Sequence, residues 1–172
     1  MSSPTVNFLS YNSTGISSLK CDFMNKISDE YNVNYISLQE HFKKTKTTDK
    51  YFSGNFPQYN SYVIPAVRAK DQDVGRPKGG LVQFSRKTID VRKDRISTKS
   101  YRLQAQVLNF PKVRILWINS YFPNDPLTET FDDSDLLEVL SEIESIIDKT
   151  IFDDIVWNGD LNLCQLQFWT TS

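Results

Sequence analysis

The stretch Val33-Asn34-Tyr35-Ile36-Ser37-Leu38-Gln39-Glu40 decides the fold, because it joins a run of β-forming residues to a polar end. It predicts a strand over 33–38. Residues 6–11 predict an earlier strand. Between the two, apolar residues recur at the spacing of an amphipathic helix, namely Ile16, Leu19, Phe23, Met24 and Ile27. Strand, helix and strand in this order predict a βαβ-like opening, with Glu40 at the carboxyl end of a strand.

The rest of the chain continues the α/β pattern. Further strands are predicted over 61–64, 80–84, 101–110, 113–121 and 154–158, and residues 43–56 are polar and basic, which predicts a long loop. Pro111-Lys112 indicates a tight connection, so the strands on either side should pair antiparallel. A second helix should begin near 132–134, with its buried stripe formed by Leu136, Leu137, Leu140, Ile143, Ile146 and Ile147. We therefore expect sheets that are covered by helices.

Length and composition indicate one folded domain with an intracellular location. The chain has 172 residues, 39% of them hydrophobic, which suffices for one core. The first residues show no secretion signal, and no apolar run approaches the roughly 20 residues that cross a bilayer. Cys21 and Cys164 have no metal-binding spacing, so they read as buried reduced thiols.

Charge is divided along the chain although its net value is only -1. Residues 41–114 carry 17 Lys and Arg against 5 Asp, whereas residues 115–172 carry 12 Asp and Glu against one Lys. A basic middle of this kind can face a phosphate backbone, beside an acidic part that carries metal chemistry. Solvated faces that merely differ in sign would give the same counts.

Several predicted strands end in a carboxylate or carboxamide. Because the ends of neighbouring strands converge along one edge of a sheet, such side chains can form a cleft-lining site. Each residue alone has a simpler explanation, since Asn and Asp favour turns and helix caps. The combination indicates a site made of Asn12, Glu40, Asn124, Asp160 and Asn162.

Five short motifs follow one another along the chain, namely Ser10-Tyr11-Asn12, Leu38-Gln39-Glu40, Gly75-Arg76-Pro77-Lys78-Gly79-Gly80, Asn119-Ser120-Tyr121-Phe122-Pro123-Asn124 and Gly159-Asp160-Leu161-Asn162. In their order and spacing they resemble the endonuclease/exonuclease/phosphatase superfamily. The resemblance implies a four-layered α/β/β/α sandwich. The second and third motifs look most like the endonuclease domain of LINE-type (non-LTR) retrotransposons, while apurinic/apyrimidinic repair endonucleases share the Tyr121 and Asp160 motifs and remain an alternative.

The resemblance implies a magnesium-dependent phosphodiesterase that hydrolyses the nucleic-acid backbone as a DNA endonuclease. Glu40 and Asn12 would hold Mg²⁺, with Mn²⁺ as an alternative, because magnesium accepts few protein oxygens and keeps several waters. Asp160 would be the general base, oriented by Asn162. Tyr121 and Asn124 would donate to the phosphate, and Arg76 would contact the backbone.

The same resemblance implies the setting of the protein. Its partner would be DNA, with no membrane and no haem or nucleotide cofactor. It would form part of a longer polyprotein with a reverse transcriptase and act in the nucleus.

The sequence departs from the family pattern at its end. Family members carry a further Asp and an Asp-His pair beyond the Gly-Asp-x-Asn motif, whereas residues 164–172 do not resemble that continuation and the only histidine is His41, to which we assign no catalytic role. We expect a domain over 1–163 that lacks its last strands, with weak or absent activity. The alternatives are a catalytically inactive retroelement-derived fragment that acts as a binding module, and a phosphoinositide or phospholipid phosphodiesterase of the same fold.

Overall fold

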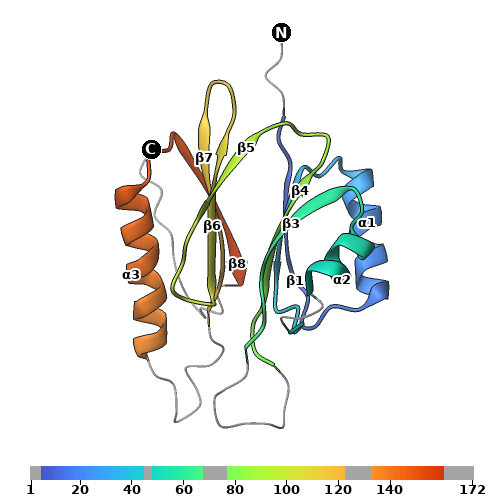
Figure 1. Cartoon of the computed structure of the whole chain (residues 1–172), viewed down its shortest axis with the longest axis horizontal. Coiled ribbons are helices and arrows are strands. Elements are labelled where there is room, and N and C mark those ends of the chain that lie inside the picture. The colour runs from blue at the N-terminus through green and yellow to red at the C-terminus, as the bar shows by residue number, and fades with distance from the viewer. Residues whose placement is uncertain (1–4, 45–47, 68–76, 123–132, 161–172) are drawn as a thin grey trace.

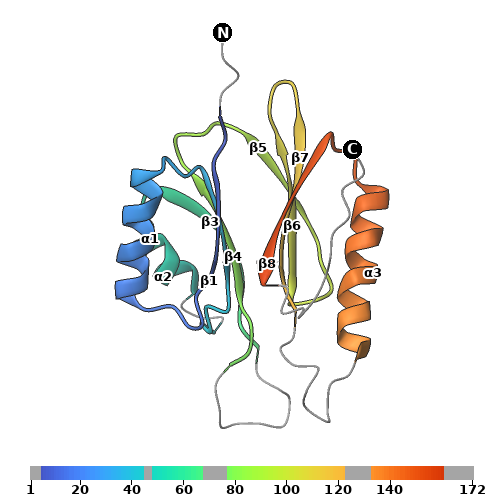
Figure 2. The same ribbon diagram turned by 180° about the vertical axis from the view of Figure 1, so that it is seen from behind.

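Two four-stranded sheets pack face to face between helices (Figures 1 and 2). The computed structural model describes residues 5–44, 48–67, 77–122 and 133–160. Helices α1 and α2 lie on the outer face of one sheet, and α3 lies on the outer face of the other. The predicted α/β/β/α sandwich is confirmed.

The first sheet contains the βαβ opening. Its strand order is β1 (Phe8–Asn12), β2 (Tyr35–Gln39), β4 (Leu81–Arg86) and β3 (Tyr59–Ile64). β1 and β2 are parallel and joined through α1, whereas β4 is antiparallel to both of its neighbours. All five residues of β2 are buried, because α1 and α2 cover one face and the second sheet covers the other.

The second sheet has the order β5 (Arg92–Ile96), β6 (Leu103–Asn109), β7 (Arg114–Tyr121) and β8 (Asp154–Asp160). β6 and β7 form the predicted antiparallel pair, and β8 runs parallel to β7. β5 was not among the predicted strands. Its sequence Arg-Lys-Asp-Arg-Ile lacks apolar alternation, so its pairing with β6 is the reason that it is extended.

Helix α1 (Ser18–Glu30) begins after Ser17, whose hydroxyl accepts a hydrogen bond from the backbone N–H of Lys20. The buried residues of the helix are Cys21, Met24 and Ser28. The prediction that Leu19 and Phe23 lie in the buried stripe is wrong, because their side chains are 79% and 52% exposed. Cys21 is a buried free thiol, as predicted, and Cys164 lies outside the described residues.

The prediction of a loop over 43–56 is wrong in its second half, where α2 (Thr48–Asn55) forms. Phe52 is fully buried in this helix, and Phe56 is fully buried directly after it. Both rings contact Phe84 of β4, with ring centroids 5.4 and 4.4 Å apart. The tertiary contacts of two aromatic rings thus stabilise a helix whose other residues are mostly polar.

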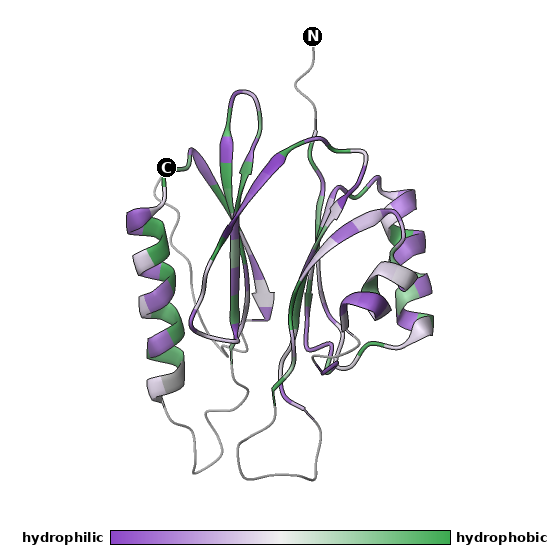
Figure 3. Ribbon diagram, viewed as in Figure 1, coloured by the Kyte–Doolittle hydropathy of each residue, from purple (hydrophilic) through white to green (hydrophobic). Residues whose placement is uncertain are grey.

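Helix α3 (Asp133–Lys149) covers the second sheet, and Figure 3 shows its apolar residues gathered on the side that faces this sheet. Val139, Ile143 and Ile146 are buried there with Leu116 and Ile118 of β7. The predicted stripe is therefore partly correct. Its member Leu137 is 62% exposed, and the buried Val139 was not predicted.

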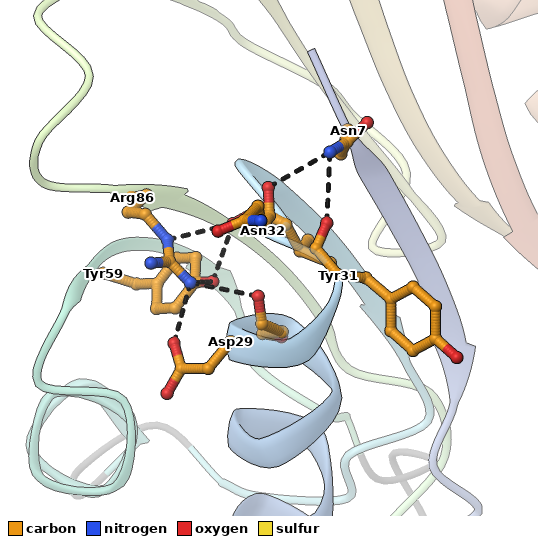
Figure 4. Close-up of polar contacts among 8 residues, drawn as sticks. Asn7, Asp29, Tyr31, Asn32, Tyr59 and Arg86 are labelled. Carbon is orange, nitrogen blue, oxygen red and sulfur yellow. Dashed lines mark hydrogen bonds and ion pairs between the residues drawn. The ribbon is translucent and has the colours of Figure 1, made fainter. Parts of the chain in front are cut away.

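Arg86, the last residue of β4, ties the first sheet to the end of α1 (Figure 4). Its guanidinium donates to the Asp29 carboxylate at 2.9 Å, to the Ser28 carbonyl at 3.1 Å and to the Val33 carbonyl at 3.0 Å. Tyr59 completes the cluster, since its hydroxyl accepts from Arg86 at 3.1 Å. These contacts hold the connection between the end of α1 and the start of β2 in place.

No helix in the part of the chain that the structure describes is both long enough and apolar enough to cross a membrane.

Candidate active site

Four of the predicted site residues meet where strands of both sheets end. Asn12 is the last residue of β1 and pairs with Gln39 of β2, directly before Glu40. Tyr121 is the last residue of β7 and pairs with Asp160, the last residue of β8. β1 and β2 are parallel to each other, and so are β7 and β8. Each pair therefore brings the carboxyl ends of two strands to one edge of its sheet.

Two side-chain contacts connect these ends across the sheets. The Asn12 amide nitrogen donates a hydrogen bond to the Asp160 carboxylate. The Tyr121 hydroxyl lies beside the Glu40 carboxylate, which interacts with it electrostatically. Burial, Glu40 and the Asp160 charge raise the pKa of Tyr121, and Arg102 opposes this in part. The Tyr121 hydroxyl is therefore protonated at neutral pH and available as a donor.

Glu40 is held by its backbone in a conformation that side chains rarely adopt. Its φ is +54°, and its carbonyl accepts hydrogen bonds from the Gly15 N–H at 2.7 Å and the Ser13 hydroxyl at 3.0 Å. The Glu40 side chain is only 8% exposed. Strain of this kind persists only where the surroundings determine the conformation. The carboxylate position is thus fixed by contacts from the loop after β1.

His41, the residue after Glu40, is buried and holds the same part of the chain in place, a region called the His41 corner. Its Nε2 lies 3.2 Å from the Ile64 carbonyl, and its Nδ1 accepts from the Lys43 N–H at 3.0 Å. Burial is the main reason that the pKa of His41 falls to about 4, so the ring is neutral. Both ring nitrogens are engaged in holding the chain, which agrees with the absence of His41 from the predicted catalytic residues.

Two glycines allow close packing at the two halves of the site. A Cβ on Gly80, whose φ is +92°, would lie 2.6 Å from the His41 ring. A Cβ on Gly159 would lie 2.5 Å from the backbone oxygen of Ser120 on β7. Glycine is therefore required at position 80 because of the His41 ring, and at position 159 because β8 approaches β7 closely.

A layer of buried polar side chains connects the strands that carry Glu40 and Tyr121. The Gln39 amide nitrogen donates to the Asn119 side-chain oxygen at 2.7 Å, and the Asn119 amide donates to Gln104 at 3.3 Å. Trp117 donates through its ring nitrogen to Ser37 at 2.9 Å. Since hydrogen bonds are directional, this layer fixes the relative position of the two sheets at the site.

Arg102 is a site residue that sequence reasoning missed. It lies just before β6, its backbone carbonyl accepts from the Tyr121 N–H at 2.9 Å, and it is 9% exposed. Its guanidinium carbon lies 5.1 Å from the Tyr101 ring centroid and 5.7 Å from that of Tyr121. An Arg just before a strand indicates a functional site only when the side chain is known to be buried, and burial is known from the structure alone.

The other predicted residues, Arg76, Asn124 and Asn162, lie outside the described residues. Within the described ranges, no group of three or more His, Cys, Asp and Glu side chains could hold a metal ion. Glu40 and Asp160 nevertheless bring two carboxylates to one edge, where Asp160 accepts a hydrogen bond from Asn12 and Glu40 lies beside Tyr121. Hard oxygen donors in small number suit magnesium, which keeps much of its water. The residues present therefore fit a hydrated Mg²⁺.

No family model and no curated protein sequence matches the chain. Solved structures do match. The AP endonuclease LMAP from Leishmania major has a TM-score of 0.62 at 17% identity, covering 92% of this chain and 55% of that one. D. rerio TDP2 complexed with single strand DNA product has a TM-score of 0.58 at 13% identity, covering 93% and 62%. The endonuclease domain of TRAS1, a telomere-specific non-LTR retrotransposon, has a TM-score of 0.59 at 12% identity, covering 94% and 61%.

These structures are members of the endonuclease/exonuclease/phosphatase superfamily, and the predicted resemblance of the chain to that superfamily is confirmed in its fold. The TRAS1 domain, at 12% identity, is one of the structures that share this fold with the chain. The chain spans 55 to 62% of the length of these three structures.

Proposed function

We propose that the chain is a magnesium-dependent phosphodiesterase that acts on the nucleic-acid backbone as a DNA endonuclease of retroelement type. The observation that carries the proposal is the junction of four strand ends from both sheets, in which Asn12 donates a hydrogen bond to Asp160 and Tyr121 lies beside Glu40. Structures of the same fold support the substrate class, because they include an AP endonuclease, TDP2 complexed with single strand DNA product and a retrotransposon endonuclease domain.

Glu40 and Asn12 are the proposed ligands of Mg²⁺ or Mn²⁺, which when bound would polarise the phosphate. Of the two, Glu40 is the stronger candidate. The Asn12 amide oxygen already accepts a hydrogen bond from the Thr14 N–H at 2.9 Å, and its nitrogen is committed to Asp160. Asn12 therefore also serves to orient Asp160.

Asp160 is the proposed general base, oriented by Asn12 and Asn162. It would take a proton from the attacking water, and the hydrogen bond from the Asn12 amide holds its carboxylate in place for this role. Tyr121 and Asn124 are the proposed donors to the phosphate oxygens, with Arg76 at the backbone. Arg102, stacked on Tyr121, adds a positive charge where negative charge develops.

We further propose that turnover by these 172 residues alone is slow. In the family a histidine donates to the phosphate, whereas the only histidine here is His41, whose ring nitrogens both contact the backbone. The retroelement setting would place the activity in the nucleus, within a longer polyprotein that includes a reverse transcriptase.

Nicking of supercoiled plasmid DNA in the presence of Mg²⁺ tests the proposal. We expect slow metal-dependent nicking that falls at least about 100-fold in Asp160→Ala and Glu40→Gln. Glu138→Gln, a change at an exposed carboxylate of α3, is the matched control and should nick at the parental rate. The same assay should use a longer chain to which the TRAS1 endonuclease domain contributes its C-terminal segment.

Two results would overturn the proposal. One is nicking that persists in Asp160→Ala, since the base would then be elsewhere. The other is an absence of metal-dependent nicking by both the chain and its longer version.

A further inference from the structure

A groove runs along the side of the molecule where the edge strands β3 and β5 lie. It consists of two hollows, of about 460 and 360 Å³, that share Tyr62 and Val63 in their walls. The first extends to Lys50 on α2, and the second extends to Tyr101 before β6. The shared residues place the two hollows next to each other along β3, and together they are called the groove.

The groove is positively charged. Lys50, Arg95 and Lys99 line it, against a single carboxylate, Asp49. The Arg95 guanidinium carbon lies 4.4 Å from the Tyr62 ring centroid, so this cation is held over the groove although it is exposed. Among the described residues, none of the three cations forms an ion pair with a carboxylate. Their charge is available to an anion from solution.

One end of the groove reaches the candidate active site. Tyr101 lines the second hollow, and its ring lies 3.6 Å from the position that a Cβ on Gly79 would occupy, beside the ring of Tyr121 at 3.8 Å. Arg102 stacks on both Tyr101 and Tyr121. Tyr101 and Arg102 therefore connect the groove to Tyr121, whose hydroxyl lies beside Glu40.

We propose that this groove binds a single-stranded segment of nucleic acid that extends from the scissile phosphate, with backbone phosphates at Lys99, Arg95 and Lys50. The proposal rests on the proposed function, because that function places a phosphodiester beside Tyr121. A groove that combines cations with tyrosine rings suits a single strand, whose phosphates can meet the cations while its unstacked bases turn toward the rings. Contacts to phosphate carry no sequence preference.

Binding in the absence of metal tests the groove independently of cleavage. The full chain would be titrated in EDTA against a fluorescein-labelled 15-nucleotide oligothymidylate, with fluorescence anisotropy as the readout. We expect Arg95→Ala to weaken binding about 5-fold to 10-fold, and Arg95→Ala combined with Lys99→Ala about 30-fold or more. Because each lost contact removes about 0.7 from the slope of log K against log salt, the double variant should lower that slope by about 1.4.

Lys112→Ala is the matched control, since Lys112 is an exposed cation in the turn between β6 and β7, at the opposite end of β7 from Tyr121. It should bind within about twofold of the parent. Equal losses in Lys112→Ala and Arg95→Ala would overturn the proposal, as would unchanged binding by the double variant with a parental melting temperature. A duplex of the same length that binds as tightly, with the same loss in Arg95→Ala, would also overturn the single-strand assignment.

The two proposals fail in different ways. A chain that binds the oligonucleotide through Arg95 and Lys99 but never nicks DNA refutes the proposed function alone. Metal-dependent nicking with parental kinetics and parental oligonucleotide binding in the double variant refutes the groove alone.

Discussion

The two halves of the candidate site are held in different ways. Glu40, which directly follows β2 of the first sheet, accepts hydrogen bonds through its carbonyl from Ser13 and Gly15 of the loop after β1. The ring of the adjacent His41 contacts the Ile64 carbonyl and the Lys43 N–H. Asp160, in the second sheet, ends a strand that pairs with only one neighbour among the described residues, β7. The first half is therefore built into a core, and the second is built on an edge. Disturbing the first should affect the whole fold, whereas disturbing the second should act locally.

Gly80→Ala should have the largest effect. The added Cβ meets the His41 ring, and alanine disfavours the φ of +92°, so we expect a loss of about 3–5 kcal/mol in the free energy of unfolding. Urea denaturation followed by tryptophan fluorescence measures it. Gly54→Ala is the control, since a Cβ at Gly54 meets no atom within 4 Å. Similar stability of the two variants would contradict the tight corner around His41.

The pH dependence of stability should reveal the same corner. His41 is neutral in the native state with a pKa of about 4, whereas in the unfolded chain its pKa is about 6.5. Below pH 6.5 the unfolded chain binds a proton that the native state does not, so stability is present above pH 6.5 and is lost as the pH falls toward 4. The expected loss is about 3 kcal/mol.

The measurement is urea denaturation at several pH values between 7 and 4. His41→Gln is the control because the chain then has no histidine, and its stability should change less over this range. Equal slopes in the parent and the variant would show that the native ring takes up a proton freely.

Gly159→Ala should have a smaller and more local effect, of about 2–3 kcal/mol. The Cβ meets backbone atoms of Ser120, which cannot move without shifting β7, so β8 should separate from β7 instead. Hydrogen exchange should then show lost protection for the amides of β8 and retained protection in β2. Equal loss in both strands would remove the contrast between core and edge.

The smallest effects concern two arginines that anchor the far ends of the sheets. Arg86→Met should cost about 1–2 kcal/mol, because the side chain is only 19% exposed and donates to the Asp29 carboxylate and to the Ser28 and Val33 carbonyls. Arg114→Met should cost less than about 0.5 kcal/mol, since Arg114 and Asp153 are 42% and 49% exposed and their atoms lie 3.6 Å apart. Thermal unfolding of both variants gives the comparison. A reversed order would mean that exposure does not decide the strength of these pairs.

Sequence patterns predicted the elements whose own residues favour them. β2 and β7 are runs of β-forming residues, and α3 has helical apolar spacing, so local preference and tertiary structure agree there. β5 and α2 were missed because neither has such a pattern. Their conformations depend on partners, namely β6 for the strand and Phe84 for the helix, that lie far away in the sequence.

The candidate site divides in the same way. Strand ends identified Asn12, Glu40 and Asp160 as candidates, because a polar residue after a β-forming run can be recognised in the sequence, and the family resemblance added Tyr121. Which of them touch was not predictable, since the contact between Asn12 and Asp160 depends on how one sheet lies over the other. Arg102 was missed for a related reason, as its burial follows from the packing of Tyr101 and Tyr121 around it.

The buried polar layer made of Gln39, Asn119 and Gln104 has a consequence for how precisely the site is assembled. A purely apolar interface lets one sheet slide over the other, because apolar contacts have no preferred direction. A slip of one residue along the strands would displace Tyr121 from Glu40 by about 3.3 Å, more than the length of a hydrogen bond. The hydrogen bonds among these amide side chains between the two sheets oppose such a slip. Thermal motion within either sheet should therefore leave the distance between the Glu40 and Asp160 carboxylates nearly constant.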